Sequence, residues 1–298
     1  MSKEWTPLQP GESIGVVALS GPIDAARLEA GLVALRAWGH PLVEASNLHR
    51  EDGYLAGDDA ERLAGLEEVL DRGARWIVAA RGGYGAARLL PRLPWRRLVE
   101  AGVRFIGFSD LTAIFNPLVS KGGAAQVHGP MVAAGLAGAH NSKRLLSVLR
   151  GDMVGEVLYR FPHGSVVRGG RARGRALGGN LALLTSLLGT PWEPEFDDCV
   201  LFLEEVDEPL YRLDRMLTHL GGSGKLRNVK ALIGGSLHGC RPASQRSDVW
   251  RRLLLEAAPP DIPIVVGLPF GHGATNLAFP IGAAVELDTG ALRVMWRS

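Results

Sequence analysis

The sequence has few cysteines, few aromatic residues and almost no net charge. Its 298 residues include two cysteines, and phenylalanine, tryptophan and tyrosine together make up 6%. Lysine and arginine number 33 against 31 aspartates and glutamates, so the formal net charge is +2. So small a charge argues against a nucleic-acid partner. Cys199 and Cys240 match no zinc or redox spacing, and we interpret them as two buried thiols, although a disulfide between them is not excluded.

Long hydrophobic runs and metal-binding motifs are also missing. No stretch reaches the roughly 18 unbroken apolar residues of a membrane helix. The first ten residues, MSKEWTPLQP, lack the apolar centre of a secretory signal. We therefore expect a soluble, cytoplasmic protein without a membrane partner. The eight histidines form no H-E-x-x-H pattern, so we expect neither a metal ion nor another cofactor.

The first half of the chain alternates between short apolar runs and amphipathic stretches. Asp24 and Asp58 each precede leucines at helical spacing and are expected to cap helices. Such alternation favours a parallel sheet with helices on both faces, in which functional residues collect at the carboxyl ends of the strands. Pro117 is expected to shorten or kink its helix. The expected strands are 13–19, 41–44, 75–80, 104–108 and 124–128, and the expected helices are 24–38, 58–70 and a segment through Val119.

The pattern changes after about residue 158. Glycine and arginine dominate residues 168–174, which favours a solvated linker. We therefore predict an N-terminal domain over 1–160, a linker over 161–175 and a mixed α/β or β-rich domain over 176–298. In the last of these we expect helices at 181–188 and 210–220, strands at 199–204, 231–234 and 264–266, and a hairpin of 283–287 with 292–295.

Three familiar motifs are incomplete. Gly83-Tyr84-Gly85 begins a dinucleotide fingerprint, but Arg88 occupies the position of its third glycine. Gly224-Lys225 lacks the remaining residues of a phosphate-binding loop. Leu111 replaces the final glycine of a lipase-type G-x-S-x-G elbow around Ser109, which argues against an ordinary α/β-hydrolase.

Polar residues follow several predicted strands directly. Ser109 lies between a buried strand and a helix, where a nucleophilic hydroxyl would be exposed, although serine is also a common helix cap. Glu204 and Glu205 end a strand of the second half, so one could face a cleft while the other meets solvent or Arg212, and a solvated strand end is the simpler interpretation. His272 lies between two glycines after another strand, as ordinary loop histidines also do.

Taken together, these residues supply a nucleophile, a base and an orienting acid. Ser109, Glu204 and His272 would form such a set at a domain interface. The consecutive glycines Gly82 and Gly83 could turn backbone N–H groups toward an oxyanion, or could simply form a tight turn.

Over nearly its whole length the sequence resembles the LD-carboxypeptidase family of serine peptidases, which includes the microcin-immunity peptidases. The similarity is carried by many blocks that occur in order at compatible spacing. The most distinctive block runs from Leu-Phe-Leu-Glu-Glu at 201–205 through Tyr-Arg-Leu-Asp-Arg at 211–215. Other blocks are VVALSGP at 16–22, ARGGYG at 80–85, IGFSD at 106–110, HGPM at 128–131, GGNL at 178–181 and GHG at 271–273.

The resemblance implies a flavodoxin-like N-terminal domain, a C-terminal domain with a small barrel-like sheet, and a homodimer. It implies that Ser109 is the nucleophile, Glu204 the acid and His272 the base, without a metal ion. It assigns the oxyanion contacts to the backbone amides of Gly83 and Asp110. Arg81 and His128 lie in matched blocks and either contact the substrate or support the loops.

The resemblance further implies a small peptide or muropeptide substrate. The expected reaction removes the terminal D-alanine of murein tetrapeptide from an L-configured centre during peptidoglycan recycling in the cytoplasm. One alternative is an immunity peptidase that cleaves an aminoacyl–nucleotide antibiotic. A second alternative is a protein that binds a ligand in the same cleft without catalysis.

Overall fold

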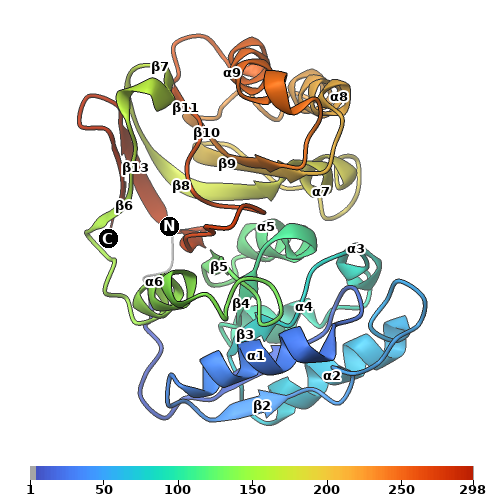
Figure 1. Ribbon diagram of the computed structural model, residues 1–298. Helices are drawn as coiled ribbons and strands as arrows, with labels where there is room; N and C mark the ends of the chain where they lie inside the picture. The colour runs from blue at the N-terminus through green and yellow to red at the C-terminus, as the bar shows by residue number, and fades with distance from the viewer. Residues whose placement is uncertain (1–4, 298) are drawn as a thin grey trace. The chain divides into compact units, whose positions relative to one another are not determined.

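The two halves of the chain fold as two α/β units in the computed structural model, which describes residues 5–297 (Figure 1). The N-terminal unit comprises Trp5–Asp152 and takes back a short segment, Asn276–Pro280, from late in the chain. The C-terminal unit comprises Met153–Thr275 together with residues 281–297. The predicted α/β class is therefore confirmed. No helix among the described residues has the length and apolar character needed to span a membrane.

A six-stranded sheet forms the centre of the N-terminal unit, with the order β12-β5-β4-β3-β1-β2. Strands β1 to β5 pair in parallel, as the alternating pattern predicted. Every residue of β1, β3 and β4 is buried, because helices cover both faces of the sheet. The elements are β1 (Ile14–Val17), α1 (Ala25–Arg36), β2 (Leu42–Glu44), α2 (Asp59–Asp71), β3 (Trp76–Ala79), α3 (Ala86–Leu89), α4 (Trp95–Glu100), β4 (Arg104–Gly107), α5 (Thr112–Ser120), β5 (Gln126–His128), α6 (Ala139–Leu149) and β12 (Phe279–Ile281).

Local sequence signals explain where the first helices begin. The Asp24 side chain accepts a hydrogen bond from the Arg27 amide at 2.9 Å, and Asp58 forms a reciprocal capping box with Glu61. Pro117 does not end its helix, since α5 continues past it to Ser120. All of α5 from Thr112 to Val119 is buried, and this packing outweighs the missing backbone donor.

The C-terminal unit is built on an eight-stranded mixed sheet with the order β6-β14-β13-β8-β9-β10-β11-β7. Its central strands β8 to β11 are parallel, and antiparallel strands flank them. The predicted hairpin is confirmed as β13 and β14. The elements are β6 (Val157–Arg160), β7 (Val166–Arg168), β8 (Arg171–Asn180), α7 (Leu181–Ser186), β9 (Cys199–Val206), α8 (Leu210–Gly222), β10 (Ala231–His238), α9 (Arg246–Ala257), β11 (Ile264–Val265), β13 (Ala284–Asp288) and β14 (Arg293–Trp296), with short 3₁₀ turns at His163–Ser165 and Ala243–Gln245.

The segment 161–175, expected to be a linker, is instead part of this sheet. It contains β7 and the first half of β8. Arginines alternate with small residues along the start of β8, a period of two that suits a half-exposed strand. The small residues are required because the strands approach closely: a Cβ added at Gly174 would lie 2.4 Å from the Asp198 carbonyl oxygen.

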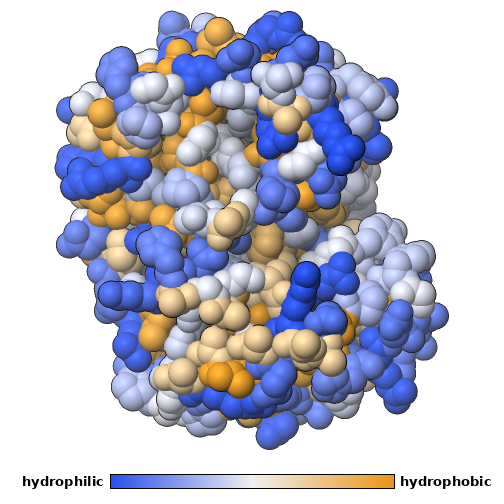
Figure 2. Space-filling model, in the orientation of Figure 1, coloured by the Kyte–Doolittle hydropathy of each residue, from blue (hydrophilic) through white to orange (hydrophobic). Residues whose placement is uncertain are grey.

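The surface over α1 carries exposed apolar side chains. Figure 2 shows pale and orange side chains over this helix, where Val33 is 57% exposed. Scattered exposed apolar residues of this kind are ordinary on protein surfaces. This apolar surface alone therefore marks no ligand site.

Candidate active site

Ser109 lies in a strained turn at the carboxyl end of β4. Its φ is +59°, a left-handed conformation that costs a non-glycine residue about 1–3 kcal/mol. A helix-capping serine has an extended backbone, whereas here the cap position of the following 3₁₀ turn belongs to Phe108. The capping interpretation of Ser109 is therefore wrong. Strain of this kind concentrates at functional sites.

The glycine-rich loop after β3 packs directly against Ser109. A Cβ added at Gly82 would lie 3.0 Å from the Ser109 Cβ and 3.2 Å from its Oγ, so only glycine fits there without displacement. The Gly82 carbonyl accepts a hydrogen bond from the Gly21 amide at 3.0 Å. Because a trans peptide points its C=O and N–H in opposite directions, the Gly83 amide is directed away from Gly21.

Asp110 holds the loops around Ser109 together. Its Oδ2 accepts hydrogen bonds from the Ser20 hydroxyl at 2.6 Å and from the Ala86 amide at 2.7 Å. Burial raises the pKa of this carboxyl, and the two hydrogen bonds oppose that shift only in part. The side chain of Asp110 therefore ties the ends of β1 and β3 to the turn that carries Ser109.

Arg81 and His128, the two candidate substrate contacts, differ in their surroundings. Arg81 is exposed, and its Nη1 donates to the Pro22 carbonyl at 2.5 Å, across the loop after β1. His128 is fully buried, with its ring stacked on Phe279 at a centroid distance of 4.9 Å. This burial favours a supporting role for His128, whereas Arg81 remains accessible to a ligand.

Glu204 and His272 form an ion pair within the C-terminal unit. The Glu204 Oε2 lies 2.6 Å from His272 Nδ1, and the Glu204 side chain is fully buried. Glu204 is on β9, whereas His272 lies in the loop after β11. Gly271 makes this approach possible, because a Cβ there would lie 2.5 Å from Glu204 Oε2. Such a pairing fixes the tautomer of the ring.

Glu205 is buried as well, so neither solvent nor Arg212 contacts it as the sequence suggested. Its oxygens accept hydrogen bonds from Asn180 Nδ2 at 2.6 Å, the Ala182 amide at 2.7 Å and the Val206 amide at 2.9 Å. Arg212 pairs with Glu208 instead. Burial raises the pKa of Glu205 to about 7, with a smaller contribution from the charge of Glu204. Glu205 therefore links the end of β9 to the start of α7.

The electrostatics of the C-terminal unit favour a charged imidazole. Burial lowers the pKa of His272, but the hydrogen bond and charge of Glu204 outweigh it. The charges of Glu205 and Asp207 act in the same direction, and the net result is a pKa above the ordinary value of about 6.5. A histidine of this kind is a strong base near neutral pH.

This shift predicts the pH dependence of catalysis. If neutral His272 acts as the base, activity rises with pH, and the acid limb of kcat/KM lies above pH 6.5. In Glu205→Gln the limb should move to lower pH, because the carboxylate form of Glu205, whose own pKa is about 7, no longer stabilises the imidazolium. Measurement of kcat/KM from pH 5 to 9 on both proteins tests this. An acid limb below 6 in the unsubstituted protein would contradict it.

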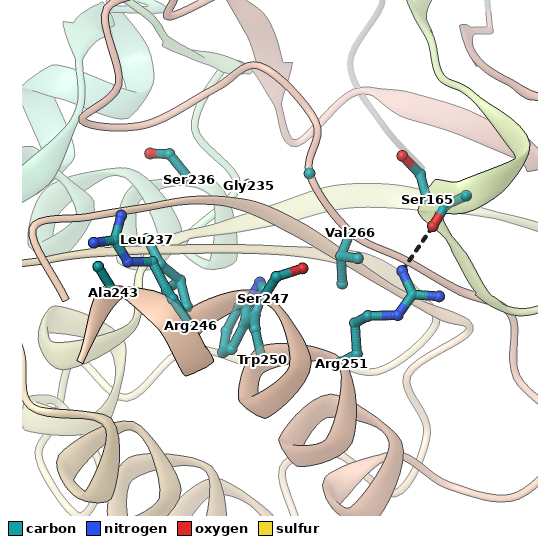
Figure 3. A pocket seen from close by; sticks show the side chains of 12 residues that line it. Ser165, Gly235, Ser236, Leu237, Ala243, Arg246, Ser247, Trp250, Arg251 and Val266 are labelled. Carbon is teal, nitrogen blue, oxygen red and sulfur yellow. Dashed lines mark hydrogen bonds between the residues drawn. The ribbon is translucent and has the colours of Figure 1, made fainter. Parts of the chain in front are cut away.

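A cavity of about 470 Å³ is lined in part by Ser236, which contacts the loop that carries His272. Figure 3 shows Ser236 of β10 on one side and Arg246, Trp250 and Arg251 of α9 on the other. The Ser236 hydroxyl accepts a hydrogen bond from the Gly273 amide at 3.3 Å. Arg251 donates to backbone carbonyls of the segment before β8, so its charge serves the fold.

Sequence reasoning missed several residues that support these groups. Asn180 caps α7 and also binds Glu205, and Ser20 binds Asp110. Ser20 follows the predicted strand 13–19, so its place at a strand end was an available signal, whereas no strand was predicted before Asn180. Ser236 had no such signal, because β10 extends beyond the predicted strand to His238. Among residues 5–297 there is no cluster of three or more histidine, cysteine, aspartate or glutamate side chains suited to a metal ion.

Serine-type hydrolases use a serine, a histidine and a carboxylate, and residues of these three types lie at or after strand ends in the two units. The family model described as the LD-carboxypeptidase N-terminal domain matches residues 14–129, and the model of the C-terminal domain matches residues 173–287. The chain therefore belongs to the LD-carboxypeptidase family, and the resemblance seen in its sequence is confirmed.

Individual relatives cover almost the whole chain. A Streptomyces coelicolor protein named as a candidate carboxypeptidase is 40% identical over 96% of this chain and 94% of its own length. The murein tetrapeptide carboxypeptidase of Pseudomonas aeruginosa is 35% identical over 97% of this chain and 96% of its own. The microcin C7 self-immunity protein MccF of Escherichia coli is 24% identical over 95% and 92% of the two chains. A solved structure of MccF with glutamyl sulfamoyl guanosine has the same fold, with a TM-score of 0.87, 23% identity and coverage of 98% and 97%.

Proposed function

We propose that the protein is a serine carboxypeptidase that hydrolyses an L,D peptide bond and releases the terminal D-alanine of murein tetrapeptide. The observation that carries this proposal is the buried Glu204–His272 pair, at 2.6 Å, in an LD-carboxypeptidase family member that also holds Ser109 in a strained strand-end turn. The name of the Pseudomonas aeruginosa relative supports the choice of substrate.

In the proposed mechanism, the Ser109 hydroxyl attacks the carbonyl carbon of the scissile bond while His272 Nε2 accepts its proton. Glu204 orients the ring through Nδ1 and stabilises the imidazolium. The amides of Gly83 and Asp110 hold the oxyanion of the tetrahedral intermediate. His272 then returns the proton to the leaving amino group of D-alanine. In the second half of the reaction, His272 accepts a proton from water as the water attacks the carbonyl carbon of the acyl-enzyme, and the proton then passes to the Ser109 oxygen as the acyl group leaves.

A free carboxylate at the substrate terminus is part of the proposal. Arg81 is exposed and lies next to the loop that packs on Ser109, so its guanidinium is the side chain we assign to that carboxylate. An amidated substrate would leave this charge without its partner. We therefore expect the tetrapeptide amide to be cut about 10²–10⁴-fold more slowly than the free acid in kcat/KM.

The decisive experiment compares matched tetrapeptides as the free acid, the C-terminal amide and the all-L diastereomer, with products resolved by mass. Release of D-alanine from the free acid alone is the expected result. Equal rates for acid and amide would contradict recognition of the terminal carboxylate. Preference for the all-L peptide would contradict the L,D specificity and leave a serine hydrolase with another substrate.

The alternative substrate is an aminoacyl nucleotide, which the similarity to MccF suggests. An aminoacyl-sulfamoyl nucleoside included in the same assay distinguishes the two activities. A protein that only binds ligands would not react with an active-site serine reagent. By family resemblance, we place the reaction in peptidoglycan recycling in the cytoplasm, and cell fractionation tests the location. The same resemblance leads us to expect a homodimer, which sedimentation tests.

A further inference from the structure

Two exposed tyrosines lie beside the loops that surround Ser109. Tyr54 is 64% exposed and Tyr84 is 52% exposed. Their rings are in edge contact, with centroids 5.6 Å apart and planes at 65°. An edge contact leaves a flat face of at least one ring open to a ligand.

Hydrogen bonds and close packing hold the backbone segments that carry the two tyrosines. Tyr54 lies in a tight turn closed by two hydrogen bonds between Asp52 and Leu55, at 2.8 and 3.0 Å. The Ala56 amide then donates to the Ser20 carbonyl at 2.9 Å, which fixes this turn to the end of β1. Tyr84 lies two residues after Gly82, in the loop that packs on Ser109.

The two loops that carry the tyrosines are also packed on each other. A Cβ added at Gly85 would lie 2.7 Å from Leu55 Cδ2, so the loop after β3 sits directly on the turn of Tyr54. Gly21 connects the same segments, since a Cβ there would lie 3.2 Å from the Gly82 oxygen and 3.5 Å from the Tyr54 oxygen. The ring pair is therefore preorganised, and a short chain of contacts joins it to the nucleophile.

An arginine lies beside the ring pair and is held by a carboxylate. Arg88 is close enough to both phenols to interact with them electrostatically. Its guanidinium makes a bidentate pair with Asp59, at 2.9 and 3.1 Å. Asp59 also pairs with the buried Arg62 at 2.5 Å, so Arg88 is held in place beside the rings but is not fully neutralised. The exposed rings, not the charge, are therefore the feature that favours a ring-bearing ligand.

We propose that Tyr54 and Tyr84 form a stacking subsite for a ring carried on the acyl side of the scissile bond. This rests on the proposed function and names a further part of the substrate. The pyranose of an N-acetylmuramoyl peptide has a flat apolar face, and so does the base of an aminoacyl nucleotide. For a murein substrate the ring is the muramoyl sugar, and the protein would favour sugar-linked over free tetrapeptide.

The test measures kcat and KM for free tetrapeptide and for N-acetylmuramoyl-tetrapeptide, and the binding of an aminoacyl-sulfamoyl nucleoside by calorimetry. In Tyr54→Ala and Tyr84→Ala we expect about a 10-fold loss of kcat/KM for the muramoyl peptide, mainly through KM, with the free tetrapeptide unchanged. Tyr54→Phe and Tyr84→Phe should retain activity, because they keep the ring. Tyr211→Ala is the matched control, since Tyr211 is equally exposed, at 64%, but lies on α8 of the other unit.

The outcomes separate this proposal from the function on which it rests. A loss confined to ring-bearing ligands supports the subsite, and whether the sugar or the nucleoside is affected identifies the source of the ring. Equal losses on free and muramoyl tetrapeptide, or no loss on any ring-bearing ligand, would overturn it. If the unsubstituted protein cleaves no tetrapeptide, the proposed function fails, and the nucleoside and the uncleaved muramoyl peptide still report on the subsite through their dissociation constants.

Discussion

Ser109→Ala should abolish turnover while leaving the fold intact. Loss of a catalytic nucleophile lowers kcat by about 10⁴–10⁶-fold. Ser109 is held at a φ of +59° by its neighbours, and alanine can occupy the same backbone conformation with a smaller side chain. Steady-state kinetics on tetrapeptide, together with a thermal unfolding curve, measure both parts of the expectation.

A companion variant separates chemistry from stability. Ser109→Gly should be equally inactive but more stable than the unsubstituted protein by about 1 kcal/mol, because glycine adopts positive φ without strain. Higher stability with no activity would show that the strain at this position serves function. A Ser109→Ala protein that keeps a tenth of the original kcat would rule out this serine as the nucleophile.

Glu204→Gln is expected to have the second largest effect, a loss of kcat on the order of 10³-fold or more. The Glu204 carboxylate accepts the Nδ1 proton of His272 at 2.6 Å and is fully buried. An amide can turn its own N–H toward the ring, which would favour the wrong tautomer and remove the charge that stabilises the imidazolium. The pKa of His272 should fall at the same time, which a histidine NMR titration measures.

Glu205→Gln is the matched control for Glu204→Gln. The three groups that hydrogen-bond to it are all donors, so an amide would place an N–H against one of them and lower the stability. The loss of kcat should nevertheless be much smaller than for Glu204→Gln, since it is Glu204 that contacts His272. The reverse ranking of the two variants would show that the orienting acid is Glu205.

Local signals in the sequence determined most elements of the N-terminal unit. Side-chain caps at Asp24 and Asp58 and apolar periodicity act over a few residues, so they can be recognised without knowledge of the fold. The same reasoning predicted the strands that precede Ser109, Glu204 and His272. Their roles came from the family blocks around them, not from periodicity.

Contacts between distant segments determined features that local sequence patterns did not predict. The Gly- and Arg-rich segment 161–175 became strand because β8 could pair with β9 and β13, which no local pattern encodes. Residues Asn276–Pro280 joined the N-terminal unit, where Phe279 stacks on His128 and Arg144 binds the Ala278 carbonyl. Such contacts join residues more than 100 positions apart.

The two adjacent glutamates show most clearly which features the sequence determines and which depend on the tertiary structure. Alternation along a strand establishes that Glu204 and Glu205 face opposite ways, but it does not say which of them meets His272. Only the tertiary structure brings the loop after β11 to Glu204 and the start of α7 to Glu205. The sequence by itself determined that acids, a serine and a histidine stand at strand ends, because strand ends follow from local periodicity. The partner of each side chain depended on sheet order and register, which arise from packing between distant segments.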